Sequence, residues 1–284
     1  MPDKEPPLVE LSQNISSKIS ESKGVFAVAF ADLKTGDTLF INADERFHAA
    51  STMKTPVMIE LYKQAAEGKF SLDDSILVKD DFISIVDGSA YTMDVSEDSE
   101  TILYEKVGAR LPIRAIMFEM ITQSSNLATN ILIELVDAKK VTATMRDLGA
   151  PDIEVLRGVE DIKAFEKGLS NSTTAFDLMK IFEAIGKDEI ISEEVCKEMV
   201  GVLLKQKFNE IIPANLPEDV KIAHKTGSIT GVQHDSGLVI LPNGHEYVLI
   251  LLSKNLESSD QGVAILAEIS KMVYDYVVSE KHQH

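Results

Sequence analysis

The spacing of apolar residues divides the chain into a mixed beginning, a helical middle and a strand-rich end. From Leu8 to Ser22, apolar residues recur every three or four positions, which predicts an amphipathic helix that ends at Gly24. The β-rich runs 24–33 and 37–42, joined by a turn-like Lys34-Thr35-Gly36, predict a hairpin. From Ser51 to about Lys207 helical periodicity dominates, most clearly in 53–68, 113–136, 174–186 and 192–205.

The strand pattern returns near the end of the chain. Segments 220–229, 235–242 and 246–253 predict three strands, and Pro-Asn-Gly at 242–244 predicts a tight turn between the last two. A final helix is expected from about Asp260 to Ser279. Segment 80–101 is the least regular, and we expect it to be a long surface excursion.

These elements predict an α+β fold. Both ends of the chain would supply one antiparallel five-stranded sheet, flanked by the N- and C-terminal helices. We expect residues 1–50 and 215–284 to form this α/β lobe and residues 51–214 to form an inserted all-α lobe. A binding site is expected in the cleft between the two lobes.

Composition excludes several classes of protein. The chain has 284 residues, is 44% hydrophobic and contains no long uncharged apolar run, so we expect a soluble globular protein without a membrane span. A formal net charge of −18 argues against nucleic acid and anionic membrane surfaces as partners. The single Cys196 is expected to be a core thiol. Because the histidines are singly placed, we expect no metal site and no cofactor.

Short serine and lysine motifs occur in two sets. The first comprises Ser20 three places before Lys23, Ser12-Gln13-Asn14 and Lys34-Thr35-Gly36. These lie in the wrong order on one short helix and a hairpin turn, so they cannot surround a substrate. The second set is Ser51-Thr52-Met53-Lys54, Ser124-Ser125-Asn126 and Lys225-Thr226-Gly227. It falls on a helix N-terminus, a loop of the helical lobe and an edge strand, which could converge on one cleft.

In this second set the chain resembles the serine β-lactamase and penicillin-binding-protein superfamily, whose class A motifs are S-x-x-K, S-D-N and K-T-G. The resemblance in order and spacing extends over essentially the whole chain. It implies a β-lactamase/transpeptidase-like fold, a small-molecule β-lactam substrate and a monomer. It also implies a periplasmic or secreted protein whose leader has been removed.

The chemistry explains why these residue types are needed. A serine hydroxyl is a weak nucleophile and requires a neighbouring base. Lys54 lies one helical turn after Ser51, where the helix dipole and nearby cations disfavour an ammonium group, so it could accept a proton.

The resemblance implies further roles along the cleft. The backbone N–H groups of Ser51 and Ser228 would form the oxyanion hole, Ser124 would pass a proton to the leaving nitrogen, and Lys225 would lie near that hydroxyl and the substrate carboxylate. Substrate binding would involve Asn126, which would also brace Lys54, together with Thr226, Gly227 and Ser228. Taken singly, Ser124 and Asn126 could merely cap a helix, and Lys225 could be a solvated strand charge.

The chain departs from the class A pattern in two loops. Ser125 replaces an aspartate that normally braces the middle motif, although Asn130 stays at the expected distance. For the base that frees the acyl group we prefer Glu160, which follows Ser124 by 36 residues. Glu166 copies the local motif but comes too close to Asn171, and Glu160 could instead be an exposed loop acid.

The remaining departures concern the same region. Asn171 takes the place of the acid that would pair with Arg157, so we expect that salt bridge to be replaced or lost. Ser51 and Ser124 are 73 residues apart, with surplus residues in or near 78–100 that would reshape one wall of the cleft.

Three functions remain open from the sequence. The leading hypothesis is a class A-like serine β-lactamase that acts through an acyl-enzyme on Ser51 and a water activated by Glu160. A D,D-peptidase or esterase would use the same acylation residues without needing Glu160. A non-turnover penicillin-binding module would be acylated and stay so.

Overall fold

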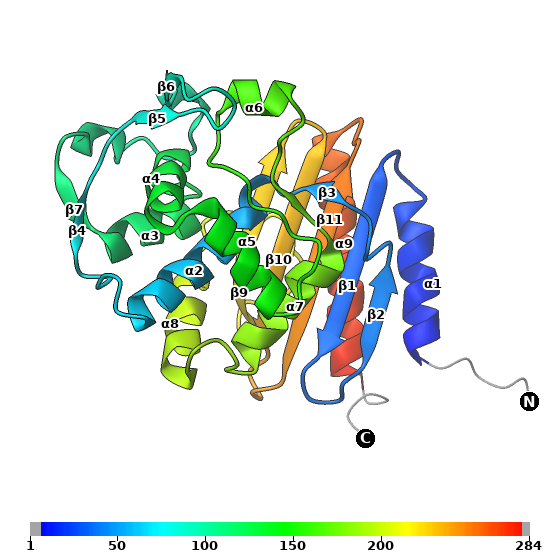
Figure 1. Ribbon diagram of the computed structural model, residues 1–284. Helices are drawn as coiled ribbons and strands as arrows, with labels where there is room; N and C mark the ends of the chain where they lie inside the picture. The colour runs from blue at the N-terminus through cyan, green and yellow to red at the C-terminus, as the bar shows by residue number, and fades with distance from the viewer. Residues whose placement is uncertain (1–6, 280–284) are drawn as a thin grey trace, which may run out of the picture.

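The computed structural model describes residues 7–279, which build a central five-stranded antiparallel sheet in the order β2-β1-β11-β10-β9 (Figure 1). The strands are β1 (Val25–Asp32), β2 (Thr38–Ile41), β9 (Lys221–Ile229), β10 (Val232–Ile240) and β11 (Glu246–Lys254). The predicted α+β class and five-stranded sheet are therefore confirmed. The strand that carries Lys225-Thr226-Gly227, β9, lies at the edge of the sheet, as the sequence predicts.

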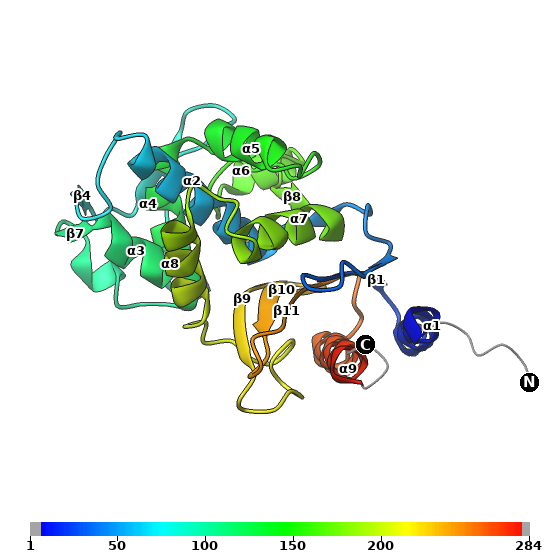
Figure 2. The ribbon, with the colours of Figure 1, turned by 90° about the horizontal axis from the view of Figure 1, so that it is seen from below.

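The two faces of the sheet bury side chains of different size. Figure 2 shows α1 (Pro7–Ile19) and α9 (Ser259–Val278) on one side of the sheet and the remaining helices on the other. On β1, Phe26, Val28 and Phe30 pack toward α1 and α9, while the alternate alanines pack with α7 (Ala175–Gly186). Because both faces are covered, β1 is apolar from Val25 to Ala31 and shows no polar alternation.

The helical part surrounds α2 (Lys54–Ala66), which is buried along most of its length. Around it lie α3 (Ile113–Thr122), α4 (Asn126–Val136), α5 (Ala138–Asp147) and α8 (Glu193–Leu203). The helical periodicity over 113–136 belongs to two helices, and the turn between them at Ser124, whose φ is +58°, is the loop expected for the middle motif. The periodicity analysis missed α5, which is polar and buries only a narrow apolar stripe, and α6 (Ile162–Glu166), which is too short to show a helical period.

The expectation that segment 80–101 lies at the surface agrees with the structure, in which most of its residues are exposed. The segment contains a hairpin of β5 (Asp81–Ile83) and β6 (Ala90–Thr92), followed by the 3₁₀ turn η2 (Val95–Glu97). Within it, the side chains of Phe82, Ser84, Met93 and Glu100 are buried. The hairpin therefore lies at the surface of the helical part and is anchored there by these buried side chains.

Short elements complete the connections between the larger ones. They are β3 (Phe47–His48) paired with β8 (Ser172–Thr173), β4 (Ser75–Leu77) paired with β7 (Arg110–Pro112), and the 3₁₀ turns η1 (Ala50–Met53) and η3 (Tyr104–Lys106). Cys196 is buried and donates to the Ile190 carbonyl, so the expected core thiol is confirmed. No helix within residues 7–279 is long and apolar enough to cross a bilayer. All five sheet strands come from 1–50 and 215–284, but the exact division into two lobes stays a prediction.

Candidate active site

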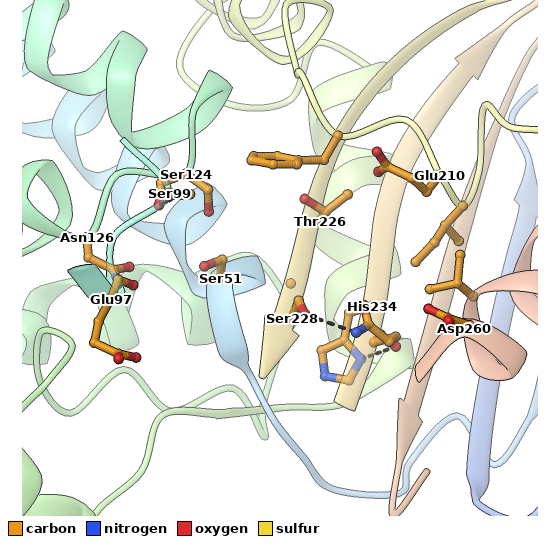
Figure 3. Close-up of a pocket in the computed structure, with 15 residues that line it drawn as sticks. Ser51, Glu97, Ser99, Ser124, Asn126, Glu210, Thr226, Ser228, His234 and Asp260 are labelled. Atoms are coloured by element: carbon orange, nitrogen blue, oxygen red, sulfur yellow. Dashed lines mark hydrogen bonds between the residues drawn. The ribbon is translucent and has the colours of Figure 1, made fainter. Parts of the chain in front are cut away.

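The second set of motifs meets in one cavity. Ser51 lies in η1 just before α2, Ser124 in the turn between α3 and α4, and Thr226 on β9, and all three line a cavity of about 470 Å³ (Figure 3). This volume is typical of a small-molecule site. The first set of motifs lies elsewhere: Ser12 is on α1, across the sheet, and Thr35 is in the β1–β2 turn.

Ser51 is held at the cavity wall by a strained turn and a close strand. The preceding Ala50 has a φ of +46°, and its N–H donates to His48 Nδ1 at 3.0 Å. A Cβ at Gly227 would lie 3.1 Å from the Ser51 nitrogen and 3.2 Å from Ala50 Cβ. Glycine at this position therefore allows the edge strand to approach the backbone N–H of Ser51.

Lys54 is the first residue of α2 and is fully buried. Its Nζ donates to the Ser124 carbonyl at 2.6 Å, to Ser124 Oγ at 3.2 Å and to Asn126 Oδ1 at 3.1 Å. Burial lowers the pKa of Lys54 to about 7, against the opposing charges of Asp98 and Glu160. A lysine with this pKa can act as a base near neutral pH.

The hydroxyl of Ser124 lies between two amines. It accepts from Lys54 Nζ at 3.2 Å and from Lys225 Nζ at 3.0 Å. Lys225 is fully buried, so the alternative of a solvated strand charge is wrong. Burial and the nearby charge of Lys54 lower the pKa of Lys225 well below its ordinary value. Ser125, and not Ser124 or Asn126, is the side-chain cap of α4.

Asn126 connects Lys54 with Glu160. Its Oδ1 accepts from Lys54, while its Nδ2 donates to Glu160 Oε1 at 3.1 Å. Glu160 Oε2 accepts from the backbone N–H of Asp94 at 3.0 Å. Burial raises the pKa of Glu160, although these hydrogen bonds partly offset the shift. Glu160 is half-buried with a φ of +62°, whereas Glu166 is exposed at the end of α6.

The salt bridge expected to be replaced or lost at Arg157 is replaced by hydrogen bonds to the backbone. The Arg157 guanidinium donates to the carbonyls of Leu169 and Gly158, both at 2.9 Å. Asn171 Oδ1 accepts from the N–H of Leu156 at 2.8 Å, and its Nδ2 donates to the Arg157 carbonyl at 2.9 Å. The buried amide of Asn171 thus closes the loop without a charge.

The β5–β6 hairpin supports the Glu160 loop from its other side. Asp161 accepts from Ser84 Oγ at 2.8 Å and from the Ile85 N–H at 2.9 Å. The hydroxyl of Tyr91 donates to the Val159 carbonyl at 3.2 Å. The surplus residues between Ser51 and Ser124 therefore help to hold Glu160 in its unusual backbone conformation.

Sequence reasoning missed several residues of the cavity. The other lining residues are Glu97, Ser99, Phe208, Glu210, Ile211, Gln233, His234, Asp260 and Val263. They belong to no motif, and the only signal for any of them was the surplus length around 78–100.

His234 is fully buried, and this burial lowers its pKa to about 4, so its ring is neutral at physiological pH. In the part of the chain that the structure describes, no group of three or more His, Cys, Asp or Glu side chains could hold a metal ion.

Comparisons with known proteins agree with this fold and arrangement. The profile of the Beta-lactamase enzyme family matches residues 10–277, so the chain belongs to that family. A β-lactamase from Bacteroides uniformis is 25% identical over 281 residues, covering 94% of this chain and 90% of its own length.

Two solved structures are similar over nearly the whole chain. A β-lactamase from Sphaerobacter thermophilus superimposes with a TM-score of 0.78 at 25% identity, covering 93% of this chain and 95% of its own. The structure of PBP-A superimposes with a TM-score of 0.83 at 28% identity, covering 95% and 97%. The resemblance to serine β-lactamases and penicillin-binding proteins is confirmed.

Proposed function

We propose that this protein is a class A-like serine β-lactamase that opens β-lactam rings through an acyl-enzyme on Ser51. The observation that carries the proposal is the Ser124 hydroxyl held between Lys54 and Lys225, in the cavity that Ser51 lines. Such an arrangement offers a nucleophile, a base of lowered pKa and a path for a proton.

In the acylation half, neutral Lys54 accepts the Ser51 proton while Oγ attacks the lactam carbonyl. The backbone N–H groups of Ser51 and Ser228 stabilise the oxyanion, and the close approach at Gly227 supports this pairing. As the C–N bond breaks, the proton passes through the Ser124 hydroxyl to the leaving nitrogen. Thr226 hydrogen-bonds the substrate carboxylate, with Lys225 nearby, and Asn126 holds the acylamide group while bracing Lys54.

In the deacylation half, Glu160 takes a proton from a water molecule that attacks the ester carbonyl. The bond between the carbonyl carbon and Ser51 Oγ then breaks, and the proton that Glu160 took from the water is passed to Oγ, which restores the serine hydroxyl and the carboxylate. Glu160 suits this role because its carboxylate is joined to Lys54 through the single side chain of Asn126. Its raised pKa also brings it closer to neutrality, which favours a general base.

The proposed substrate is a small-molecule β-lactam. All the proposed catalytic residues come from one chain, so the protein can act as a monomer. Membership of the family supports a periplasmic or secreted location, where such substrates are met.

Purified protein should hydrolyse nitrocefin at neutral pH without added metal. The reason is that Ser51, Lys54, Ser124 and Glu160 supply the nucleophile and every proton transfer. Steady-state absorbance of the opened chromophore measures the rate, and chelator should leave it unchanged. Absence of hydrolysis by folded protein would remove the lactamase proposal.

The acylation rate should rise with pH and level off above about pH 7. Below its pKa Lys54 is protonated and cannot accept a proton, so the rate should fall about tenfold per pH unit. Single-turnover rates in the Glu160→Gln variant isolate acylation. If Lys54 is the base, the fall in acylation rate at low pH should persist in this variant. Its disappearance would assign the acylation base to Glu160 instead.

A D,D-peptidase or esterase is the second candidate, and the environment of Glu160 favours it. Both oxygens of this carboxylate already accept hydrogen bonds, and Glu160 is not among the described residues that line the cavity. A variant of PBP-A, a similar structure at 28% identity, is described as an acyl-enzyme complex with penicillin G. Faster turnover of D-Ala-D-Ala peptides or p-nitrophenyl esters than of lactams, with a persistent penicillin adduct, would favour this candidate.

A further inference from the structure

The N-terminus of α4 follows directly on the catalytic loop, and its side-chain cap is an uncharged serine. Ser125, fully buried, accepts from the N–H of Ala128 at 3.2 Å. The first two N–H groups of the helix, on Asn126 and Leu127, remain for another acceptor. Unsatisfied N–H groups at a buried helix end are costly.

Asp98, from the segment after the β5–β6 hairpin, supplies that acceptor. Its carboxylate accepts from the N–H of Asn126 at 2.9 Å and from the N–H of Leu127 at 2.9 Å. The carboxylate also accepts from the hydroxyls of Tyr104, at 3.1 Å, and Ser125, at 3.4 Å, and from the N–H of Glu100 at 3.3 Å. A carboxylate bound by several N–H donors at the positive end of a helix is strongly held.

The residues around Asp98 tie the same segment to the catalytic loop. The Glu97 carbonyl accepts from Asn126 Nδ2 at 3.4 Å, and Ser99 Oγ donates to the carbonyls of Gln123 and Ser124 at 2.7 and 3.3 Å. The negative charge of Asp98 also raises the pKa of Lys54 against the effect of burial.

We propose that Asp98 is a positioning residue that sets the orientation of Asn126 and, through it, the position of Lys54. The inference rests on the proposed function, because it concerns the same acylation site. Asp98 belongs to none of the three motifs, so the charge that holds this loop comes from the segment after the β5–β6 hairpin. Position 125 could carry the same charge, since aspartate is as good a helix N-cap as serine.

The test is a charge-relocation cycle with the variants Asp98→Ala, Ser125→Asp and the double variant. Loss of the Asp98 carboxylate should lower the acylation rate by about 10²-fold, because Asn126 and Lys54 lose their geometry. The double variant should recover most of this loss, while Ser125→Asp alone should be impaired by the approach of two carboxylates. Asp81→Ala, an exposed acid on β5, serves as the matched control and should leave the rate unchanged.

Two readouts distinguish positioning from simple destabilisation. In Asp98→Asn, which removes the charge at constant size, the rising limb of the acylation pH profile should shift to lower pH. Amide hydrogen exchange at Asn126 and Leu127 should quicken in Asp98→Ala and slow again in the double variant. Wild-type rates in Asp98→Ala, an unmoved limb in Asp98→Asn, or a double variant no better than Asp98→Ala would overturn the proposal. Because the exchange readout needs no turnover, it tests Asp98 even if lactam hydrolysis is not found.

Discussion

Replacing Ser51 with alanine should reduce the rate of nitrocefin hydrolysis by about 10⁶-fold, the size of loss seen when a serine hydrolase loses its nucleophile. The substitution removes one oxygen from a half-buried side chain, so the fold should be retained. The remaining groups around Ser124 cannot form a covalent intermediate, which leaves only binding and oxyanion stabilisation.

The chain offers a matched control for this variant. Ser20 also stands three residues before a lysine, but it is exposed and donates only to the Ser17 carbonyl at 2.6 Å. Ser20→Ala should hydrolyse nitrocefin at the wild-type rate. Steady-state rates measure the effect, and equal melting temperatures of the variants show that the fold is retained. More than 1% of wild-type activity in Ser51→Ala would exclude Ser51 as the nucleophile.

Replacing Glu160 with glutamine should separate the two halves of the reaction. Acylation should continue, giving a burst of one equivalent of opened lactam, while turnover falls by about 10³-fold because the water loses its general base. Glutamine keeps the size of the side chain and can still accept a hydrogen bond from Asn126. Stopped-flow absorbance would measure the burst and the slow phase.

Glu166→Gln is the control for this second variant. Glu166 lies exposed at the end of α6, and its substitution should change neither phase. If Glu166→Gln accumulated the acyl-enzyme while Glu160→Gln turned over normally, the two assignments would have to be exchanged.

Much of the fold could be predicted because the apolar side chains that the sheet strands and long helices bury recur at regular spacing. The turn at 242–244 and the edge position of Lys225 followed from local turn chemistry and motif order. By contrast, α5 is too polar to be found from its periodicity. The motif analysis placed 124–126 in a loop, but the left-handed backbone of Ser124 is held by tertiary hydrogen bonds from Lys54 and Ser99, which no local pattern shows.

The site could be predicted only where a motif marks it. The structure places Lys54 and Lys225 in hydrogen-bond contact with Ser124, and Ser51 and Ser124 line the same cavity. The sequence could indicate this convergence because the three motifs fall on three separate elements. Asp98 could not be found this way. Its importance comes from a long-range contact with the N-terminus of α4, and one acid among several in an irregular stretch has no distinguishing pattern.

The most direct measurement is peptide mapping of the Glu160→Gln variant after exposure to a penicillin. Trypsin should release residues 47–54, FHAASTMK, which contain Ser51 and end at Lys54. We expect this peptide to carry the mass of the intact drug, with fragmentation locating it on Ser51, and the adduct on wild-type protein to clear within the assay. An unmodified 47–54 peptide in folded variant protein, or an adduct on another residue, would contradict the account.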